Sequence, residues 1–349
     1  MNPDARDNFR QQAEWCARLG SPFTALVCKV LYERLTENSA FGARLLNWPG
    51  RPDADVIAGR ACAALNFYAR EGCPALAPLY PPHPLPSEDE YWRGAEIAIR
   101  DLDALLTRFL DSAPQTNEVA RSAALLPGYL RIAGRAGLPL SIREIGSSAG
   151  LNLWFDRYGY DYGAFAWGRP DAEVKIACEW RGGVEPLPGA IDVGERRGCD
   201  IHPIDPSDPV ARARMLAYIW PDQAERLARA EAALDLAARS DLRVETIDAA
   251  LFAERELRAG APGSALVLAH TIFWQYLPAQ TKAAIRAAIA EASARATRAS
   301  PFAWLRLEAE AEEHRGAVLR LSMWPDEPVD EILALASFHG QWLEWRAAG

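Results

Sequence analysis

The chain has 349 residues and a net charge of −9, and it is 50% hydrophobic and 24% charged. These proportions are typical of a globular protein, and the length allows one large domain or two. The acidic balance gives no overall attraction to phosphate backbones, so we expect a small-molecule substrate and no nucleic-acid partner. No sequence segment approaches the roughly 20 apolar residues that span a bilayer, so no membrane partner is expected.

The six cysteines form no C-x-x-C pair, and acids are mixed with arginines among the first ten residues. The first pattern is typical of reduced thiols and the second argues against a secretory signal. We therefore expect a cytoplasmic protein without a bound metal.

The N-terminal third is predicted to be helical, because apolar residues recur at helical spacing from residue 4 to about 139. A proline-rich stretch over residues 72–86 interrupts the pattern and is expected to be an ordered loop with apolar residues to bury. Thr116 and Asn117 are typical N-cap residues, so a helix is expected to begin there. We predict a helical cap region over residues 1–113 and a second domain over 114–349.

The second domain is organised around Leu140 to Trp154, which reads LSIREIGSSAGLNLW. The apolar start predicts a buried strand with Glu144 near its end, and Gly146–Gly150 predict a small-residue turn that leads into a helix. Glycine lets the backbone approach a ligand, and the first N–H groups of a helix point at it. The arrangement is typical of an anion or nucleotide site, although a turn without a ligand has the same pattern.

Three kinds of site use such a turn. Enzymes that bind S-adenosylmethionine (SAM) carry acid-x-Gly-x-Gly-x-Gly, in which Glu144, Gly146 and Gly150 are in register and Ser148 replaces the middle glycine. Serine hydrolases carry G-x-S-x-G, which the same turn matches, whereas the dinucleotide fingerprint G-x-G-x-x-G does not match. The hydrolase interpretation is less favoured, because the preceding residues are predicted to be helical and contain no His-Gly-Gly segment.

After the turn, strands and helices alternate, which indicates a mostly parallel sheet. Residues 173–180 predict a strand within an inserted hairpin near 159–197, and Asp200 is expected to end the second strand of the sheet. An acid there binds ribose hydroxyls in nucleotide-binding folds, although it commonly lies only about 20 residues past the glycines. The other predicted elements are helices over 215–238 and 282–299 and strands over 243–249, 264–270, 302–308, 317–323 and 332–338.

Ligands of parallel sheets bind beyond the carboxyl ends of the strands. The strand over 264–270 therefore directs a group of residues to the cleft, where aromatic rings would shield a cationic sulfonium: His270, Thr271, Phe273, Trp274, Gln275 and Tyr276. His270 is the first candidate for a general base, and Glu308, at another strand end, is the second. A packing role is the simpler alternative for His270.

Five blocks of the chain resemble a bacterial family named domain of unknown function 2332. They are QTNEVARSAALLPGYL (Gln115–Leu130), REIGSSAGLNLWFDRYGYDYG (Arg143–Gly163), RRGCDIHPID (Arg196–Asp205), IWPDQAERLARAEAAL (Ile219–Leu234) and HTIFWQYLP (His270–Pro278). By analogy, the resemblance implies a Rossmann-like, methyltransferase-type three-layer α/β sandwich. Its sheet would be mostly parallel with the last strand reversed, and the helical region would precede it.

A methyltransferase-type core implies roles for particular residues. Those expected to bind the cofactor SAM are Glu144, Gly146, Ser147, Ser148, Ala149, Gly150, Asn152, Asp200, Asp248, Ala249 and His270. Those expected to bind the substrate are Gln115, Asn117, Glu118, Tyr158, Trp274, Gln275 and Tyr276. Structural alternatives remain: a helix cap and first turn for Gln115, Asn117 and Glu118, a packed aromatic loop for Tyr158, and a helix N-cap for Asp248.

We expect a SAM-dependent methyltransferase that acts on a small molecule by in-line displacement at the sulfonium carbon. The methyl donor is already activated, so the protein supplies mainly alignment and desolvation, and a base only where the acceptor must lose a proton. The alternatives are a protein that binds SAM or another nucleotide without turnover, and a serine esterase that uses Ser148.

Overall fold

The computed structural model describes residues 3–183, 189–310, 315–325 and 330–347. The chain forms two compact units. Unit 1 consists of Met1–Thr116 and Asp208–Glu231, and unit 2 consists of Asn117–Ser207 and Ala232–Gly349. The helical unit thus takes in residues 208–231 as well as the N-terminal part of the chain.

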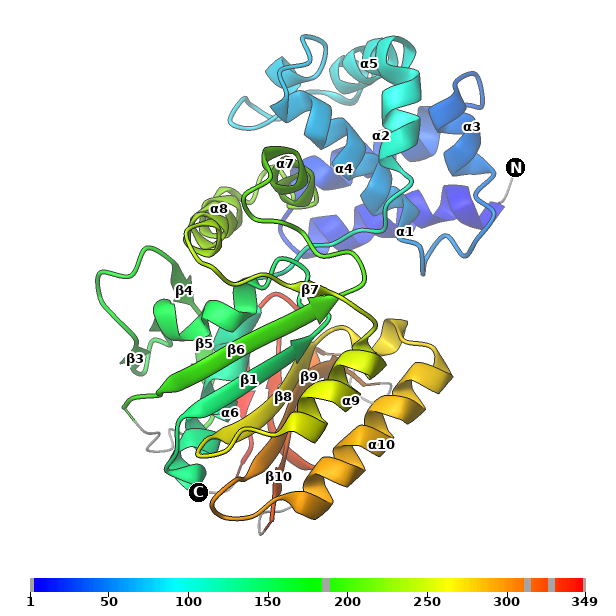
Figure 1. Ribbon diagram of the computed structural model, residues 1–349. Helices are drawn as coiled ribbons and strands as arrows, with labels where there is room; N and C mark the ends of the chain where they lie inside the picture. Colours follow the sequence, from blue (N-terminus) through cyan, green and yellow to red (C-terminus); the bar gives the residue numbers. More distant parts are fainter. Residues whose placement is uncertain (1–2, 184–188, 311–314, 326–329, 348–349) are drawn as a thin grey trace. The chain divides into compact units, whose positions relative to one another are not determined.

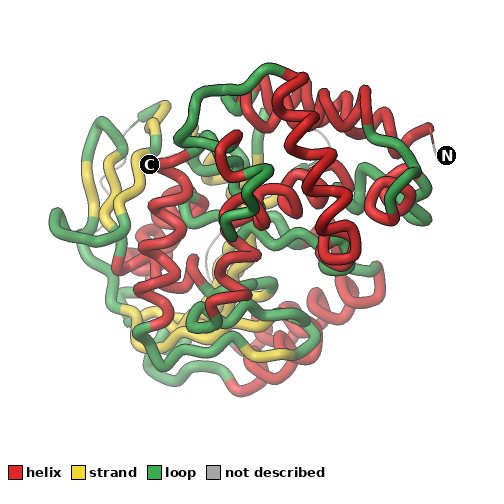
Figure 2. Tube along the Cα trace, turned by 90° about the horizontal axis from the view of Figure 1, so that it is seen from above, coloured by secondary structure: helices red, strands yellow, loops and turns green. Residues whose placement is uncertain are grey.

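Unit 1 is helical wherever it is regular in the residues described, and no strand is drawn in it in Figure 2. Its helices are α1 (Pro3–Arg18), α2 (Pro22–Arg34), α3 (Ala40–Leu46), α4 (Ile57–Arg70), the 3-10 helix η1 (Ala77–Leu79), α5 (Glu88–Phe109), α7 (Pro209–Ala217) and the first part of α8 (Ala224–Ala238). Serine caps begin three of them: Ser21 accepts from the Thr24 N–H, Ser39 accepts from the Gly42 N–H, and Ser87 forms a capping box with Glu90. The proline-rich loop buries Leu76 and Tyr80 in the core of this unit, as expected.

Unit 2 contains a mixed sheet, which in the described residues has nine strands in the order β5-β12-β11-β10-β9-β8-β1-β6-β7 (Figure 1). These strands are β1 (Leu140–Ile145), β5 (Glu179–Arg181), β6 (Val193–Asp200), β7 (Glu245–Thr246), β8 (Ala265–Thr271), β9 (Phe302–Ala309), β10 (Ala317–Trp324), β11 (Glu331–Ala336) and β12 (Trp342–Trp345). Three further strands, β2 (Gly159–Asp161), β3 (Ala166–Trp167) and β4 (Lys175–Ala177), form a small sheet in the order β3-β2-β4.

The large sheet has two parts that differ in strand direction. β7, β6, β1, β8 and β9 run parallel, as the alternation of strands and helices predicts. From β9 to β12 every neighbouring pair is antiparallel, and β5 then joins β12 in parallel. A mostly parallel sheet is therefore confirmed, but the antiparallel part is larger than the single reversed strand that was expected, because β10, β11 and β12 follow one another without helical crossovers.

Helices cover both faces of the sheet (Figure 1). α6 (Arg121–Ala136) packs against β8, β9 and β10 on one face, and α9 (Ala249–Ala259) and α10 (Ala279–Arg295) pack on the other. Ile145 of β1 belongs to the core beneath α9 and α10. Because side chains alternate along a strand, Glu144 faces the opposite side, toward α6.

A buried ion cluster explains the charged residue in the middle of the central strand. Arg143 donates to Glu256 of α9 at 2.7 Å and to Glu195 of β6 at 2.6 Å, and both Arg143 and Glu256 are buried. Both partners are anions with hydrogen-bonding geometry, so the cost of burying the arginine is compensated. This cluster ties the central strand to its neighbour and to α9.

Several predicted elements begin or end elsewhere. The helix expected after the glycine turn is a 3-10 helix, η2 (Leu151–Arg157). Three carbonyl groups of this segment accept hydrogen bonds from side chains, namely those of Leu151, Leu153 and Phe155. In an α-helix, backbone N–H groups would donate to such carbonyls. The strand expected over 173–180 divides at Cys178 into β4 and β5, and both pair in parallel with their neighbours rather than as a hairpin.

Two other boundaries also differ. The helix expected to begin at Thr116 begins at Arg121 instead, because the Asn117 side chain accepts from the Leu151 N–H rather than from its own helix. Residues 215–238, expected as one helical region, divide between α7 and α8. No helix in the described part of the chain combines the length and apolar character needed to cross a membrane.

Candidate functional site

The turn after β1 has the backbone conformation that its glycines predict. Gly146, Ser148 and Gly150 have φ angles of 70°, 54° and 72°. Glycine adopts this left-handed region without strain, whereas serine does so at a cost. The turn is fixed against β6 and the loop that follows it, since the Ser147 N–H donates to the Cys199 carbonyl and the Ile204 N–H to the Ser148 carbonyl.

Gly146 is required by a neighbouring side chain. A Cβ atom built on Gly146 would lie 2.2 Å from the ring of Phe273, which follows β8. The sequence suggested that this glycine admits a ligand close to the backbone. In the structure, the space beside Gly146 holds the Phe273 ring, so Phe273 forms part of the wall of the turn.

Asp200 is the last residue of β6 and lies at the turn. The sequence predicted that Asp200 ends the second strand of the sheet. Its carboxylate accepts from the Ser148 N–H at 3.0 Å and from the His202 N–H at 2.9 Å. Its unusual distance from the glycines in sequence follows from the insertion that carries β2 to β5 between the two strands. The acid therefore stands directly beside the glycine turn.

Three buried polar side chains around the turn carry atoms without hydrogen-bond partners among the described residues. These atoms are Oε2 of Glu144, Oγ of Ser148, and both Oδ1 and Nδ2 of Asn152. The three residues are only 3%, 7% and 2% exposed. A buried polar atom without a partner costs about 1–3 kcal/mol, so such a concentration is unusual in a structural region. We call Glu144, Ser148 and Asn152 the unpaired cluster.

Glu144 lies among aromatic side chains beneath α6. Its carboxyl contributes, after burial, to raising the pKa of Tyr129 and Tyr158 above the usual value. Burial also raises the pKa of Glu144 itself to about 8, and the nearby Asp200 carboxylate adds to this. Glu144 therefore holds its proton at neutral pH and can donate as well as accept a hydrogen bond.

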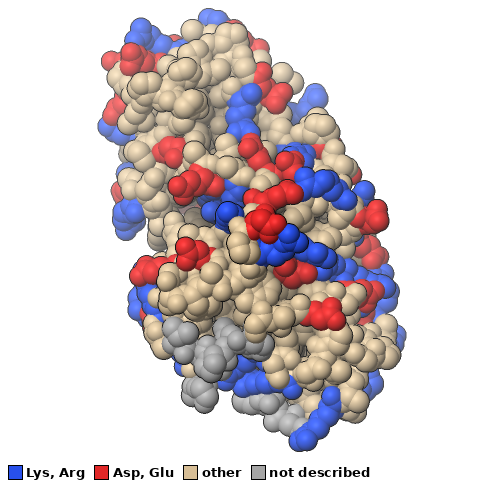
Figure 3. Space-filling view, turned by 90° about the vertical axis from the view of Figure 1, so that its left-hand side faces the viewer, with Lys and Arg blue, Asp and Glu red and all other residues tan. Residues whose placement is uncertain are grey.

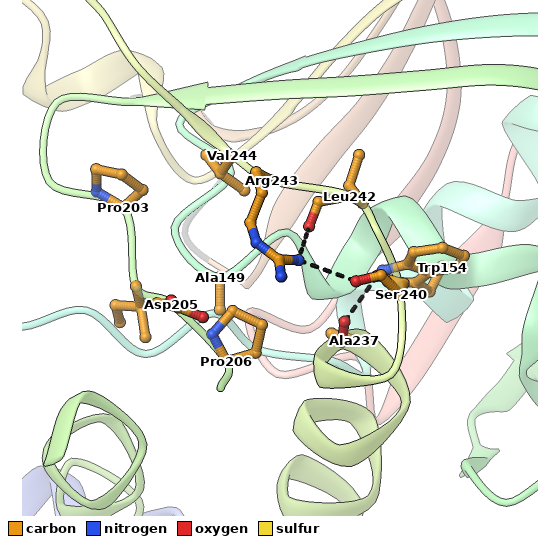
Figure 4. Close-up of a pocket in the computed structure, with 11 residues that line it drawn as sticks. Ala149, Trp154, Pro203, Asp205, Pro206, Ala237, Ser240, Leu242, Arg243 and Val244 are labelled. Atoms are coloured by element: carbon orange, nitrogen blue, oxygen red, sulfur yellow. Dashed lines mark hydrogen bonds between the residues drawn. The ribbon is translucent and has the colours of Figure 1, made fainter. Parts of the chain in front are cut away.

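A cavity of about 170 Å³ adjoins the turn (Figure 4). Its wall comprises Ala149 of the turn, Trp154 of η2, residues 203–206 after β6, the end of α8, and residues 242–244. The volume is below the roughly 300–1,000 Å³ of pockets that enclose a drug-sized ligand, so the cavity accommodates only part of such a molecule.

Polar and aromatic groups orient the wall of this cavity. The Arg243 guanidinium donates to the Ser240 and Leu242 carbonyls, both at 2.9 Å, and in Figure 4 its side chain extends between these residues and Asp205. Trp154 stacks on the Arg196 guanidinium at 4.5 Å, and Arg196 is itself bonded to Asp156. The indole is thus held in a defined orientation at the cavity.

A second buried polar cluster lies at the ends of β8 and β9, and its members are fully bonded to one another. The Trp304 indole N–H donates to Nε2 of His270 at 3.0 Å, and Nδ1 of His270 lies 2.6 Å from Glu308. Because indole only donates, Nε2 is the acceptor, so Nδ1 carries the proton and donates to Glu308. Glu308 also accepts from the Phe273 N–H through both oxygens, at 3.1 Å each. We call His270, Glu308 and Trp304 the paired cluster.

The paired cluster fixes the segment after β8. Trp274, the first residue of the 3-10 helix η3 (Trp274–Tyr276), stacks on His270 with ring centroids 5.2 Å apart. His270 is fully buried, and in this arrangement neither ring nitrogen is free to take a proton from a substrate. The role of general base stays a prediction, and it would require Trp304 to move.

The other predicted substrate residues are distributed as follows. Asn117 bonds the Leu151 N–H at 3.0 Å at the start of η2, and the buried Glu118 accepts from the Ala120 N–H. Tyr158 is buried and donates to the Leu151 carbonyl. Gln275 and Tyr276 are exposed on η3. Gln115 belongs to unit 1, whereas the other residues named here belong to unit 2.

The two residues expected near adenine have local roles in the structure. Asp248 is exposed and is the N-cap of α9, since its carboxylate accepts from the Ala250 and Leu251 N–H groups. Ala249 packs in the core beneath α9 and α10. The cap accounts for the observed contacts of Asp248 without a ligand.

Three residues of the site were missed from the sequence: Trp154, Arg243 and Trp304. Phe273 was expected in the cleft, but its contact with Gly146 depends on tertiary packing that no short pattern contains. Trp304 shares a face of β9 with Phe302 and Arg306, and this spacing does not indicate its partner. Trp154 was predicted only as a packed helix residue.

Among the residues that the structure describes, no three His, Cys, Asp or Glu side chains are placed to hold a metal ion. Acidic and basic side chains are intermixed over the face drawn in Figure 3. The Ser148 hydroxyl has no hydrogen-bond partner in the described chain, so no histidine is positioned there to activate it.

Comparison with known proteins gives a family assignment. A family model described as "Uncharacterized protein conserved in bacteria (DUF2332)" matches residues 6–345. No curated protein and no solved structure matches the chain. The matched range spans all five blocks that carry the resemblance in sequence and reaches into both units. The chain therefore belongs to the DUF2332 family of uncharacterized bacterial proteins.

Proposed function

We propose that unit 2 binds SAM at the glycine turn and functions as a SAM-dependent methyltransferase for a small molecule. The observation that carries the proposal is the unpaired cluster, because four buried side-chain atoms next to the turn have no partner in the described chain. A ligand with both donor and acceptor groups satisfies such atoms. SAM has an ammonium group, a carboxylate and ribose hydroxyls, so the residues present fit it.

The order of the parallel strands supports a nucleotide-binding core of the Rossmann type. Numbered along the chain, β7-β6-β1-β8-β9 follow the order 3-2-1-4-5. In sheets of this order the ligand lies beyond the carboxyl ends of the strands, where the connections change direction on either side of the first strand. The glycine turn follows that strand, and Asp200 ends its neighbour.

Different residues at and around the turn are expected to bind different groups of the ligand. Asp200 accepts from the Ser148 N–H and thereby keeps the turn in its left-handed conformation, and its carboxylate lies beside the turn where a ribose hydroxyl would bind. The Asn152 amide supplies donors and an acceptor, and Oε2 of the protonated Glu144 supplies one further polar atom within the buried region. The adjoining cavity, walled by Trp154 and Val244, accommodates a flat ring.

The chemistry of transfer asks little more of the chain. When bound, SAM supplies a methyl group already activated for displacement. The protein aligns the acceptor and excludes water, which the aromatic segment Phe273–Tyr276 is placed to do at the end of β8. The finer assignment of the fold as methyltransferase-type belongs to this proposal.

A binding protein without turnover is the second candidate, and one observation favours it. Both ring nitrogens of His270 are engaged, by Trp304 and by Glu308, so the residue best placed to be a base is occupied. A methyl acceptor that needs no deprotonation would not require a base. Turnover with such an acceptor would support the methyltransferase, and its absence would support the binding protein.

The test is calorimetric titration of the full chain with SAM and S-adenosylhomocysteine, with NAD as the control ligand. Asn152→Leu replaces an unpartnered amide by an apolar group of similar size. We expect this variant to lose at least about tenfold in SAM affinity and to be as stable as the wild type or more so. Gly146 is unsuitable for this purpose, because any Cβ there collides with Phe273.

Each outcome of the titration has a consequence. Absence of SAM binding to folded wild-type protein, or equal affinity in Asn152→Leu, would overturn the proposal. If SAM binds, incubation with bacterial small-molecule extract and detection of S-adenosylhomocysteine distinguishes a methyltransferase from a sensor. Labelling of Ser148 by a fluorophosphonate would instead support the esterase.

A further inference from the structure

Three cysteines of unit 1 come from three different helices and meet in its core. They are Cys16 of α1, Cys28 of α2 and Cys62 of α4. The sulfur atoms of Cys28 and Cys62 lie 3.4 Å apart. A disulfide bond requires about 2.05 Å, so the two sulfur atoms lie about 1.4 Å beyond bonding distance.

The three thiols have different surroundings. Cys16 and Cys28 are fully buried, whereas Cys62 is partly exposed. Cys28 is hydrogen-bonded to Cys16, and the Gln12 amide also donates to the Cys16 sulfur, at 3.3 Å. These hydrogen bonds lower the pKa of Cys16, while the same contact with Cys16 and burial raise the pKa of Cys28. Cys28 therefore lies between Cys16 and Cys62.

We propose that Cys28 and Cys62 form a peroxide-reactive site that closes a disulfide between α2 and α4. This inference does not depend on the function proposed for unit 2, because both residues belong to unit 1. The modification site contains no metal and no residue of the glycine turn.

The reaction proceeds in two balanced steps. The Cys62 thiol releases its proton, and its sulfur attacks one oxygen of the hydroperoxide. The O–O bond breaks, and the leaving alkoxide or hydroxide takes up a proton in place of the one released. Cys62 is then a sulfenic acid. The Cys28 thiol loses its proton as its sulfur attacks the sulfur of Cys62. The S–S bond forms, the S–O bond breaks, and the hydroxide departs with that proton as water. In total, two thiols and one hydroperoxide give one disulfide, one alcohol or water, and one further water.

The sequence makes this reaction easy to follow, because trypsin places the cysteines in separate peptides. Cys16 lies in residues 11–18, Cys28 in residues 19–29 and Cys62 in residues 61–70. The full chain is treated with hydrogen peroxide under native conditions, its remaining thiols are alkylated, and the digest is analysed by mass spectrometry. We expect peptides 19–29 and 61–70 to be joined, with the loss of two hydrogen atoms.

This pair should exceed every other cysteine pair by about tenfold or more, because proximity raises the effective concentration of the second thiol. Cys28→Ala should leave a sulfenic acid on Cys62 that dimedone traps. Cys62→Ala should abolish both products. Cys16→Ala and Cys73→Ala are the matched controls from the same unit, and neither should change which peptides are joined.

The wild-type digest tests the proposal even if a variant fails to fold. Linkage of Cys62 to Cys73 in peptide 71–93, linkage of Cys28 to Cys16, or an unmodified Cys62 would each overturn it.

Discussion

Two buried polar clusters stand at the carboxyl ends of the parallel strands, and they differ in how completely they are bonded. In the paired cluster, His270, Glu308 and Trp304 satisfy one another and the backbone of Phe273. In the unpaired cluster, Glu144 and Asn152 are equally buried but carry atoms without partners in the described chain. Each cluster contains one buried glutamate, which makes the contrast direct.

The difference indicates which cluster supports the fold and which serves a ligand. A saturated network rigidifies the structure and has no bonding capacity left, whereas unsatisfied buried atoms destabilise the protein unless something binds them. By this criterion Glu308 positions the segment after β8, and the region of Glu144 is the binding site. Four changes test this division, from the largest expected effect to the smallest.

The pH dependence of stability should reveal Glu144. Its pKa is about 8 in the folded protein against an ordinary 4.5, so between these values the folded state holds a proton that the unfolded state releases. Raising the pH therefore favours unfolding, and the stability present at low pH is lost as pH rises through 8. From pH 5 to pH 8 the loss is about 4 kcal/mol, at about 1.4 kcal/mol per pH unit. Urea unfolding measures it.

Glu144→Gln isolates this contribution, because an amide cannot ionise. The variant should lose much less stability between pH 5 and pH 8 than the wild type. Parallel stability curves for the two proteins would show that Glu144 titrates normally, and the contrast between the two glutamates would disappear.

Glu308→Ala should destabilise the protein by about 3 kcal/mol, because it leaves the buried His270 and the Phe273 N–H without their acceptor. Glu254→Ala, which removes an exposed ion pair with Arg258, is the control and should cost less than about 0.5 kcal/mol. Chemical unfolding at pH 7 compares them. Similar values for the two variants would mean that the paired cluster does not support the fold.

Gly146→Ala should cost about 2 kcal/mol, from its left-handed φ and from the collision of the new methyl group with Phe273. Gly163→Ala has a similar φ of 76° but meets no atom within 4 Å, so it should show only the smaller conformational cost of about 1 kcal/mol. Phe273→Ala should recover part of the loss in the Gly146→Ala background. A lack of coupling between positions 146 and 273 would contradict the described contact.

Asp248→Ala should cost about 1 kcal/mol through loss of the α9 N-cap. Asp248→Ser restores a capping oxygen but not the carboxylate, so the two variants separate the structural role from a ligand role. We expect Asp248→Ser to keep both stability and SAM affinity. A selective loss of affinity in this variant would return Asp248 to the binding site.

The sequence predicted most of the parallel part of the sheet, because β1 and β8 are short apolar segments and because a distinctive residue or turn marks where three of the strands end. β1 ends before the glycine turn, β6 ends in Asp200 and β8 reaches His270. The position of Asp200 at the turn could be predicted in the same way, since the carboxyl ends of neighbouring parallel strands lie together.

What the sequence could not predict depends on contacts between distant residues. The 3-10 form of η2 results from side chains of Tyr158, Tyr160 and Arg196 that bond its carbonyls. The assignment of residues 208–231 to unit 1 involves Asp222, which caps the start of α2 through Ser21 and the Phe23 N–H. Neither contact has a signature at short range, and the same is true of the Phe273 ring beside Gly146.

The position of β5 at the far edge of the sheet has a consequence for biosynthesis. Glu179 of β5 pairs with Trp342 of β12, and β12 lies between β5 and β11. On the ribosome, β5 therefore emerges long before its neighbour exists, and its edge stays unpaired until β12 has been translated. The waiting segment is the place where nascent chains of this protein are most open to chaperones or to one another.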